Sequence, residues 1–160
     1  MSARSGIGYD SHRLVEGRPL ILGGVEIDGA ERGLAGHSDA DVLTHAIIDA
    51  LLGAASLGDI GQHFPDTDER YRGADSIELL DEARALVWER DLLVANVDAT
   101  VICEAPKLGP YRERMRETLA APLGVEAARV SVKFTTNEGM GFVGRGEGIA
   151  AMAVATLERR

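Results

Sequence analysis

The sequence predicts a mixed α/β fold of the α+β type, in which helices back a mixed β-sheet. Three observations support this prediction: segments whose apolar residues alternate with period two, capped segments with an apolar stripe of helical period, and the interleaving of both kinds along the chain. We expect one domain, residues 1–160, because this length can bury a sizeable core and no linker or repeat interrupts it.

The first two strands are expected near the N-terminus. The stretch GYDSHRL, residues 8–14, lies in an apolar run, and in an extended strand Asp10 and His12 would project from the same face. Residues 18–27 also resemble a strand, with Gly23 and Gly24 suggesting a bend or bulge.

Two helices are expected next. Residues 37–59 carry a helical apolar stripe, with Ser38 as N-cap, Asp41 at the capping-box position and Gly58 as the terminator. A polar loop follows at residues 64–73. The second helix covers residues 74–91 and begins with Asp75 as N-cap and Glu78 three residues later.

The C-terminal half is expected to alternate strands with one short helix. Residues 94–106 predict a strand that runs into a proline loop, and residues 109–124 predict a helix that Pro110 opens. Residues 129–136 alternate apolar and polar side chains, which indicates a half-buried strand. Residues 148–158 are rich in alanine, which favours a helix, but their glycine-rich entry and their position after a strand lead us to predict a closing strand.

Composition excludes several classes of function. The net charge of −9, from 17 basic and 26 acidic residues, argues against duplex nucleic acid, and an aromatic content of 4% argues against base stacking on single strands. No apolar run is long enough to span a membrane, and the N-terminus lacks a signal-peptide apolar region, so we expect a cytoplasmic protein. The single cysteine, Cys103, allows neither an internal disulfide nor a thiolate zinc cluster. A small anionic substrate remains compatible with this charge if metal ions and a few cations neutralise it.

A metal site is the sharpest chemical hypothesis. Asp41, His45 and Asp49 are spaced i, i+4 and i+8 on the first helix, along one polar stripe. Together with Asp10 and His12, His45 completes two histidines and one carboxylate, a ligand set that leaves zinc an open position for substrate. Asp49 is a candidate outer acceptor for a bound histidine. The residues alone also allow a hydrogen-bonded pair, an acid–base couple or a histidine satisfied by its neighbours.

Two loops suit phosphate. Residues 139–144 match G-x-G-x-x-G, but no βαβ unit can follow them, so we reject a dinucleotide site. Thr135 and Thr136, the exposed amides after them and Glu138 suit phosphate oxygens and a hard metal ion, whereas the alternative is a flexible glycine turn. Lys107, on a proline-braced loop, is a candidate partner for phosphate, although a single exposed lysine often has no such role.

The motifs GYDSH, AGHSDADVLTHAIIDALLGAASLGDIGQHFPDTD, GADS, EAPKL, TTNEGMGF and GRGEG occur in order and cover nearly the whole chain. They resemble the 2-C-methyl-D-erythritol 2,4-cyclodiphosphate synthase family of the non-mevalonate isoprenoid pathway. Two departures are small: Tyr9 stands where the family often has Phe, and Asn137 where it commonly has Thr. The resemblance implies a homotrimer with active sites between neighbouring subunits around a central cavity.

The resemblance also implies ligands and site residues. Zn²⁺ would be held by Asp10, His12 and His45, and a second divalent ion, Mg²⁺ or Mn²⁺, would contact Glu138. His37 and Thr136 would stabilise the transition state. The remaining substrate contacts would be Ser38, Asp59, Ile60, Gly61, Phe64, Pro65, Asp66, Thr67, Asp68, Cys103, Glu104, Ala105, Pro106, Lys107, Leu108, Gly109, Thr135 and Asn137.

The central cavity carries its own expectation. Phe142 and Arg145 would border it, and it could hold an isoprenoid diphosphate, with Tyr9 adding a hydroxyl nearby. The alternative is that Arg145 only pairs with Glu147 across the interface.

The reaction that the resemblance implies is a cyclisation. The 2-phosphate of a cytidine diphosphate ester of methylerythritol attacks the β-phosphorus, CMP leaves, and a cyclic diphosphate forms. The nucleophile belongs to the substrate, so the protein must position and neutralise two phosphates. Two alternatives are a zinc phosphohydrolase of a nucleotide diphosphate ester and a non-catalytic nucleotide-binding protein.

Overall fold

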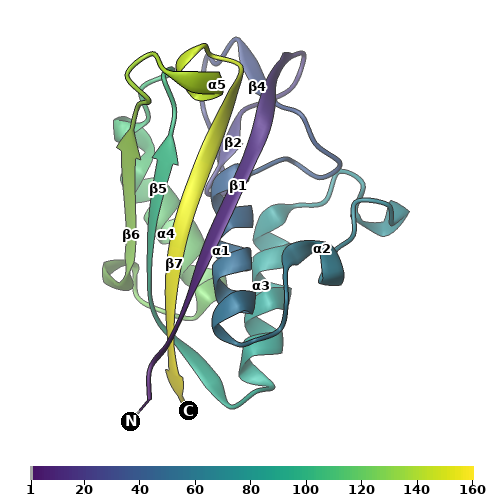
Figure 1. The fold of residues 1–160 in the computed structure, drawn as a ribbon, viewed down its shortest axis with the longest axis vertical. Helices are drawn as coiled ribbons and strands as arrows, with labels where there is room; N and C mark the ends of the chain where they lie inside the picture. The colour runs from purple at the N-terminus through teal and green to yellow at the C-terminus, as the bar shows by residue number, and fades with distance from the viewer. Residues whose placement is uncertain (1) are drawn as a thin grey trace.

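The computed structural model describes residues 2–160, and within them five strands form one mixed sheet (Figure 1). The strand order is β4-β1-β7-β5-β6; only β5 and β6 run parallel, and the other neighbouring pairs are antiparallel. The strands are β1 (Arg4–Glu16), β4 (Arg32–Leu34), β5 (Leu92–Ile102), β6 (Val130–Thr135) and β7 (Gly148–Arg159). A separate hairpin pairs β2 (Ile21–Leu22) with β3 (Val25–Glu26).

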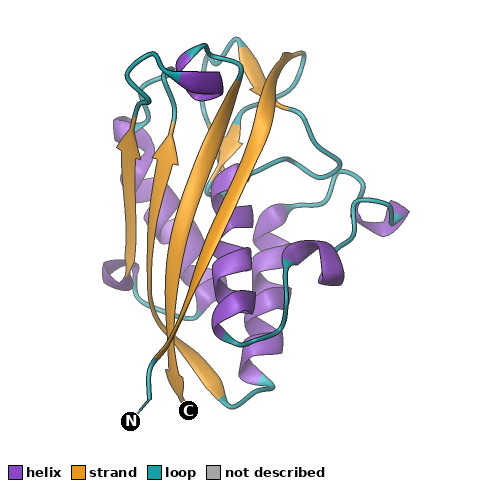
Figure 2. Ribbon diagram, in the orientation of Figure 1, coloured by secondary structure: helices purple, strands orange, loops and turns teal. Residues whose placement is uncertain are grey.

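The three longer helices lie on one side of the sheet (Figure 2). They are α1 (Val42–Ala54), α3 (Ser76–Trp88) and α4 (Arg112–Leu123); two single-turn helices, α2 (Ile60–His63) and α5 (Gly141–Gly144), lie in loops. Three short 3₁₀ turns complete the chain, η1 (Glu69–Tyr71), η2 (Gly109–Tyr111) and η3 (Ala127–Arg129). None of the helices described is long and apolar enough to cross a membrane.

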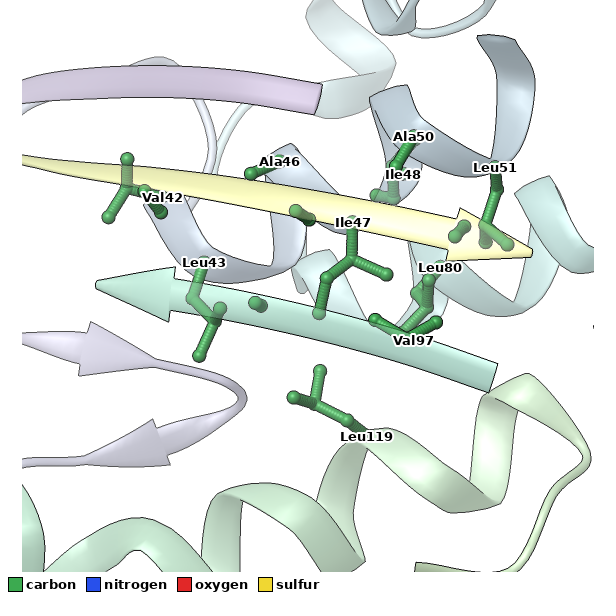
Figure 3. Close-up of a cluster of buried hydrophobic side chains, with 14 of the residues drawn as sticks. Val42, Leu43, Ala46, Ile47, Ile48, Ala50, Leu51, Leu80, Val97 and Leu119 are labelled. Carbon is green, nitrogen blue, oxygen red and sulfur yellow. The ribbon is translucent and has the colours of Figure 1, made fainter. Parts of the chain in front are cut away.

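The core forms around α1, which is buried on nearly every side. Eleven of its 13 residues are buried, and Figure 3 shows Ile47 and Leu51 among side chains from α3, α4 and β5, including Leu80, Leu119 and Val97. Each fully buried side chain of this size contributes about 1.5–3 kcal/mol. Burial of α1 therefore fixes it firmly against the sheet.

Strand β1 approaches α1 so closely because it turns two glycines toward the helix. A Cβ on Gly8 would overlap the carbonyl oxygen of Ala46, and one on Gly6 would overlap that of Ala50. Only glycine permits this contact. Asp10 lies on the same strand face as Gly8, and His45 precedes Ala46, so the close approach brings these two side chains together.

The structure corrects the predicted start and end of the first helix. The N-cap of α1 is Asp41, not Ser38, and the helix ends at Ala54, before Gly58. The Asp41 side chain accepts from the Thr44 amide and hydroxyl and from the amides of Gly23 and Gly24. Asp41 serves as the cap because its fully buried carboxylate requires hydrogen-bond donors, and these four groups supply them.

Other local predictions are confirmed or refined. Gly23 and Gly24, at φ 59° and 72°, form a tight hairpin turn rather than a bend. The second helix begins after its predicted cap Asp75, and residues 148–158 are the predicted closing strand. Pro110 lies in η2 ahead of α4, and the glycine-rich segment contains the unpredicted α5.

Candidate active site

Asp10, His12 and His45 converge on one point. The Asp10 Oδ2 atom lies 2.9 Å from His12 Nε2 and 3.1 Å from His45 Nδ1, and the two nitrogens are 3.3 Å apart. Asp10 and His12 come from β1, two residues apart on one face, and His45 comes from the first turn of α1. The predicted three-residue cluster is therefore assembled.

The outer ring nitrogens of both histidines are already engaged. His12 Nδ1–H donates to the Ala35 carbonyl at 2.8 Å, and His45 Nε2 lies 2.8 Å from the Ser76 hydroxyl oxygen. The inner nitrogens therefore turn their lone pairs toward the carboxylate. Three acceptors this close repel one another unless a proton or a metal cation lies among them, and the set of two imidazoles and one carboxylate fits a divalent metal ion.

The local electrostatics also favour positive charge at this point. Burial alone raises the pKa of Asp10, but the hydrogen bonds and charges of His12 and His45 outweigh it and lower the pKa to about 2. Burial alone lowers the pKa of His12, but Asp10 outweighs it and the net pKa is raised. Asp10 is thus held as a carboxylate, the form that binds a metal.

The predicted outer acceptor is wrong. Asp49 does not contact either histidine; its Oδ1 accepts from the Ile60 amide at 2.8 Å, which ties α1 to the start of α2. The acceptor for His45 is Ser76, with the Ser38 hydroxyl at 3.3 Å. The i, i+4 spacing places Asp49 near His45 on the helix, but the Asp49 carboxylate is engaged by the Ile60 amide and the outer nitrogen of His45 faces Ser76 of α3.

The cluster opens into a cavity of about 480 Å³. Its lining includes most of the predicted N-terminal site residues: Asp10, His12, His37, Ser38, His45, Ile60, Gly61, Phe64, Pro65 and Asp66. Gly36, Tyr71 and Leu79 also line it and were not among the predicted site residues. The predicted Asp59, Thr67 and Asp68 are not part of this lining.

Hydrogen bonds hold the loop on one side of this cavity. Asp59 and Gln62 form a capping box at the start of α2. His37 Nε2–H donates to the Asp68 carbonyl at 2.9 Å, so one nitrogen of this predicted catalytic residue anchors the loop.

A second cavity, of about 380 Å³, gathers most of the predicted C-terminal site residues. Its lining holds Cys103, Glu104, Pro106, Lys107, Leu108, Gly109, Thr135 and Thr136, together with Pro110, Arg112 and Phe134, which were not predicted. Burial raises the pKa of the Cys103 thiol to about 11, so Cys103 stays protonated and is a poor nucleophile.

Three predicted residues near this second cavity or the glycine-rich loop lie outside the lining of the cavity. Ala105 is not part of it, and neither is Asn137, whose amide donates to Glu104 at 2.7 Å. Glu138 is exposed, with φ 53°, and its amide lies 3.2 Å from the Thr136 hydroxyl oxygen.

The predicted central-cavity residues occupy a different place. Phe142 lines a small cavity with His12 and Arg13. Arg145 pairs with Glu147 of the same chain at 3.2 Å, and Arg13 approaches the same carboxylate at 3.4 Å. The pairing of Arg145 with Glu147 therefore exists within one chain.

The two large cavities lie on different parts of the sheet and, within residues 2–160, share no lining residue. Asp10 is in register with Ala151, Ala151 with Val101, and Val101 with Phe134. Three strand spacings of about 4.8 Å separate Asp10 from Phe134 by about 14 Å. One chain therefore does not bring the two predicted halves of the site together.

Comparisons with known proteins agree with the motif resemblance. A relative from Rubrobacter xylanophilus, named 2-C-methyl-D-erythritol 2,4-cyclodiphosphate synthase, is 64% identical over 162 residues, covering 98% of this chain and 95% of the relative. A solved 2C-methyl-D-erythritol-2,4-cyclodiphosphate synthase in a CDP-bound form has a TM-score of 0.88 at 41% identity, covering 97% of this chain and 100% of that one.

A longer protein contains the same fold as one part. The bifunctional IspDF from Campylobacter jejuni matches with a TM-score of 0.95 at 42% identity, covering 99% of this chain but 43% of that chain. The sequence profile of the YgbB family matches residues 3–158. Since this match spans nearly the whole chain, the chain belongs to the YgbB family.

Proposed function

We propose that this chain converts 4-diphosphocytidyl-2-C-methyl-D-erythritol 2-phosphate to 2-C-methyl-D-erythritol 2,4-cyclodiphosphate with release of CMP, as a single-domain cytoplasmic enzyme of the non-mevalonate isoprenoid pathway. The observation that carries the proposal is the convergence of Asp10, His12 and His45 in the lining of a cavity of about 480 Å³. The relatives named as this synthase supply the identity of the reaction.

The metal we propose at this cluster is zinc, because two imidazoles and one carboxylate leave one position open. When bound, it supplies a positive charge that polarises a phosphate oxygen. Asp10, His12 and His45 would hold it.

The rest of the chain positions the substrate. The 2-phosphate oxygen forms a bond to the β-phosphorus, and the bond from that phosphorus to the bridging oxygen breaks, so CMP leaves with the electron pair. The Thr136 hydroxyl donates to a phosphate oxygen, and His37 donates from Nδ1 as an imidazolium, because its Nε2–H already donates to the Asp68 carbonyl. No protein nucleophile is needed. The high pKa of Cys103 is consistent with this.

A trimer would complete the site. Asp10 and Phe134 lie at the same level of the sheet, about three strands apart, so a head-to-tail ring can place the first cavity of one copy against the second cavity of the next.

The side of the sheet that faces away from the helices also supports this arrangement. Ile7, Tyr9, Met152 and Val154 are 44–66% exposed there, and β1–β7 pairing sets Ile7 beside Val154 and Tyr9 beside Met152. We call these four residues the sheet-face patch.

Further ligands belong to the same proposal. Glu138, exposed beside Thr136, would contact a second divalent ion, Mg²⁺ or Mn²⁺, that bridges the diphosphate. Phe142 and Arg145 would border a central cavity of the trimer that holds an isoprenoid diphosphate. Release of Arg145 from Glu147 would accompany such binding.

The test is incubation of the zinc-loaded protein with the cytidyl substrate, followed by phosphorus NMR in ¹⁸O-labelled water. We expect CMP and a cyclic diphosphate without solvent oxygen. An open product that carries solvent oxygen would identify a phosphohydrolase instead. Binding without CMP release would identify a non-catalytic nucleotide-binding protein.

A further inference from the structure

A buried chain of hydrogen bonds that includes helix α3 holds the outer ring nitrogen of His45, the nitrogen that faces away from Asp10. Ser76 is the first residue of α3 and is fully buried. Its hydroxyl oxygen lies 2.8 Å from His45 Nε2, and its hydroxyl hydrogen is donated to Asp39 Oδ1 in a short hydrogen bond. The Ser76 amide also donates to Asp39, at Oδ2 and 2.9 Å.

The direction of these bonds follows from the number of hydrogens. A serine hydroxyl has one hydrogen, and a carboxylate can only accept, so the hydrogen of Ser76 goes to Asp39. The Ser76 oxygen must then accept from His45, which requires a proton on Nε2. The lone pair of the ring is left on Nδ1, the atom that faces Asp10 at 3.1 Å.

We infer that Ser76 and Asp39 are positioning residues that fix the tautomer and ring orientation of His45 so that its Nδ1 faces the metal site. This inference rests on the metal site of the proposed function and goes beyond it, because neither side chain contacts the metal position. It assigns to Ser76 the outer contact that sequence spacing suggested for Asp49. Outer contacts of this kind change metal affinity by about 10–100-fold.

The first test is Ser76→Ala, with zinc affinity measured by competition against a chromophoric chelator. We expect zinc to bind about 10–100-fold more weakly. The matched control is Asp75→Ala, next to Ser76, because Asp75 caps α3 by accepting from the Ile77 amide but does not contact His45. We expect that control to lower the melting temperature and leave zinc affinity within twofold of wild type.

The second variant is Asp39→Asn, which preserves size. The two Asp39 oxygens accept from Ser76 Oγ, from the Ser76 amide and from the Asp41 amide at 3.1 Å. Neither orientation of an asparagine amide accepts from all three donors. Ser76 therefore loses either the acceptor for its hydroxyl hydrogen or the acceptor for its backbone amide. We expect weaker zinc binding here as well.

Proton NMR of the zinc-loaded proteins supplies a readout that a purely structural role would not change. In wild type the His45 Nε2–H should exchange slowly with solvent, and in Ser76→Ala it should exchange fast. Unchanged zinc affinity and exchange in Ser76→Ala would overturn the inference, and so would an equal loss of affinity in Asp75→Ala. Failure of the wild-type chain to bind zinc would instead overturn the metal site of the proposed function.

Discussion

The histidines are distinguished by what each outer ring nitrogen contacts. His45 Nε2 meets a buried hydroxyl while Nδ1 faces the other two members of the cluster. His63, by contrast, donates Nε2–H to the Leu57 carbonyl at 2.7 Å, outside the cluster. His63 is therefore the natural control for His45.

We predict that His45→Ala loses stoichiometric zinc and CMP-releasing activity while the fold persists. The fold should persist because α1 is held by its apolar side chains rather than by His45. Metal analysis of the purified protein and circular dichroism measure the two effects. His63→Ala should retain zinc, and full zinc occupancy in His45→Ala would show that the ligand assignment is wrong.

At the second cavity, we predict that Lys107→Ala weakens CDP binding and leaves zinc bound. Loss of one charged hydrogen bond costs about 1.5–3 kcal/mol, or roughly tenfold to 150-fold in dissociation constant. Titration calorimetry with CDP measures this. Arg90→Ala removes the same charge from an exposed position in the turn after α3 and should have no effect. Equal CDP affinity in Lys107→Ala and wild type would contradict the prediction.

Among the secondary-structure elements, the contact between β1 and α1 determines the site. The backbone of Gly8 packs directly against the backbone of Ala46, so a methyl group added at Gly8 would overlap the Ala46 carbonyl oxygen. The same contact brings β1 ligands to the α1 ligand. A substitution that separates β1 from α1 should therefore lower both the stability of the fold and the affinity for a metal ion.

We predict that Gly8→Ala lowers the free energy of unfolding by about 1–3 kcal/mol or more and also weakens zinc binding, because α1 must move away from β1. Urea denaturation and chelator competition measure the two quantities. Gly109→Ala is the control, since a Cβ there meets no atom of the described chain within 4 Å. A stable Gly8→Ala protein with normal zinc affinity would refute this account.

The N-terminal cap of α1 couples that helix to the β2–β3 hairpin. We predict that Asp41→Ala costs about 3–5 kcal/mol, because it removes a cap and leaves the buried Gly23 amide and the neighbouring Gly24 amide without their acceptor. Thermal denaturation measures the loss. Asp75→Ala, a cap with one exposed acceptor bond, should cost only about 1 kcal/mol; equal losses would show that the hairpin contact adds nothing.

For the whole molecule, the sheet-face patch and the separation of the two cavities lead to the same expectation. One side of the sheet is covered by helices, whereas the other side exposes Ile7 and its three neighbours on β1 and β7. A monomer would expose this apolar face to water, whereas a ring of copies would cover the face and would also join the two cavities.

We predict that Val154→Asp dissociates the proposed trimer and lowers activity by about 100-fold or more, because the two halves of the proposed site would separate. Light scattering after gel filtration measures the mass. Ala85→Asp adds the same charge on the exposed side of α3 and should leave the trimer intact. A wild-type monomer with full activity, or a trimeric and active Val154→Asp, would contradict the proposal.

The sequence by itself determined most of the elements and the residue types of the candidate metal cluster. Period-two alternation located β6, capping residues located the start of α3, and the motifs predicted that Asp10, His12 and His45 act together. These features are local, or are encoded in residue types whose chemistry does not depend on the fold.

The tertiary structure alone decided which groups support the site. Ser38 and Asp41 both suit an N-cap, and only the hairpin amides of Gly23 and Gly24 select Asp41. Asp49 and Ser76 both suit an outer acceptor, but Ser76 is 31 residues from His45 in sequence and reaches it because α3 packs against α1. Partners this far apart are brought together by packing of the whole core, and no local pattern in a single sequence encodes that packing.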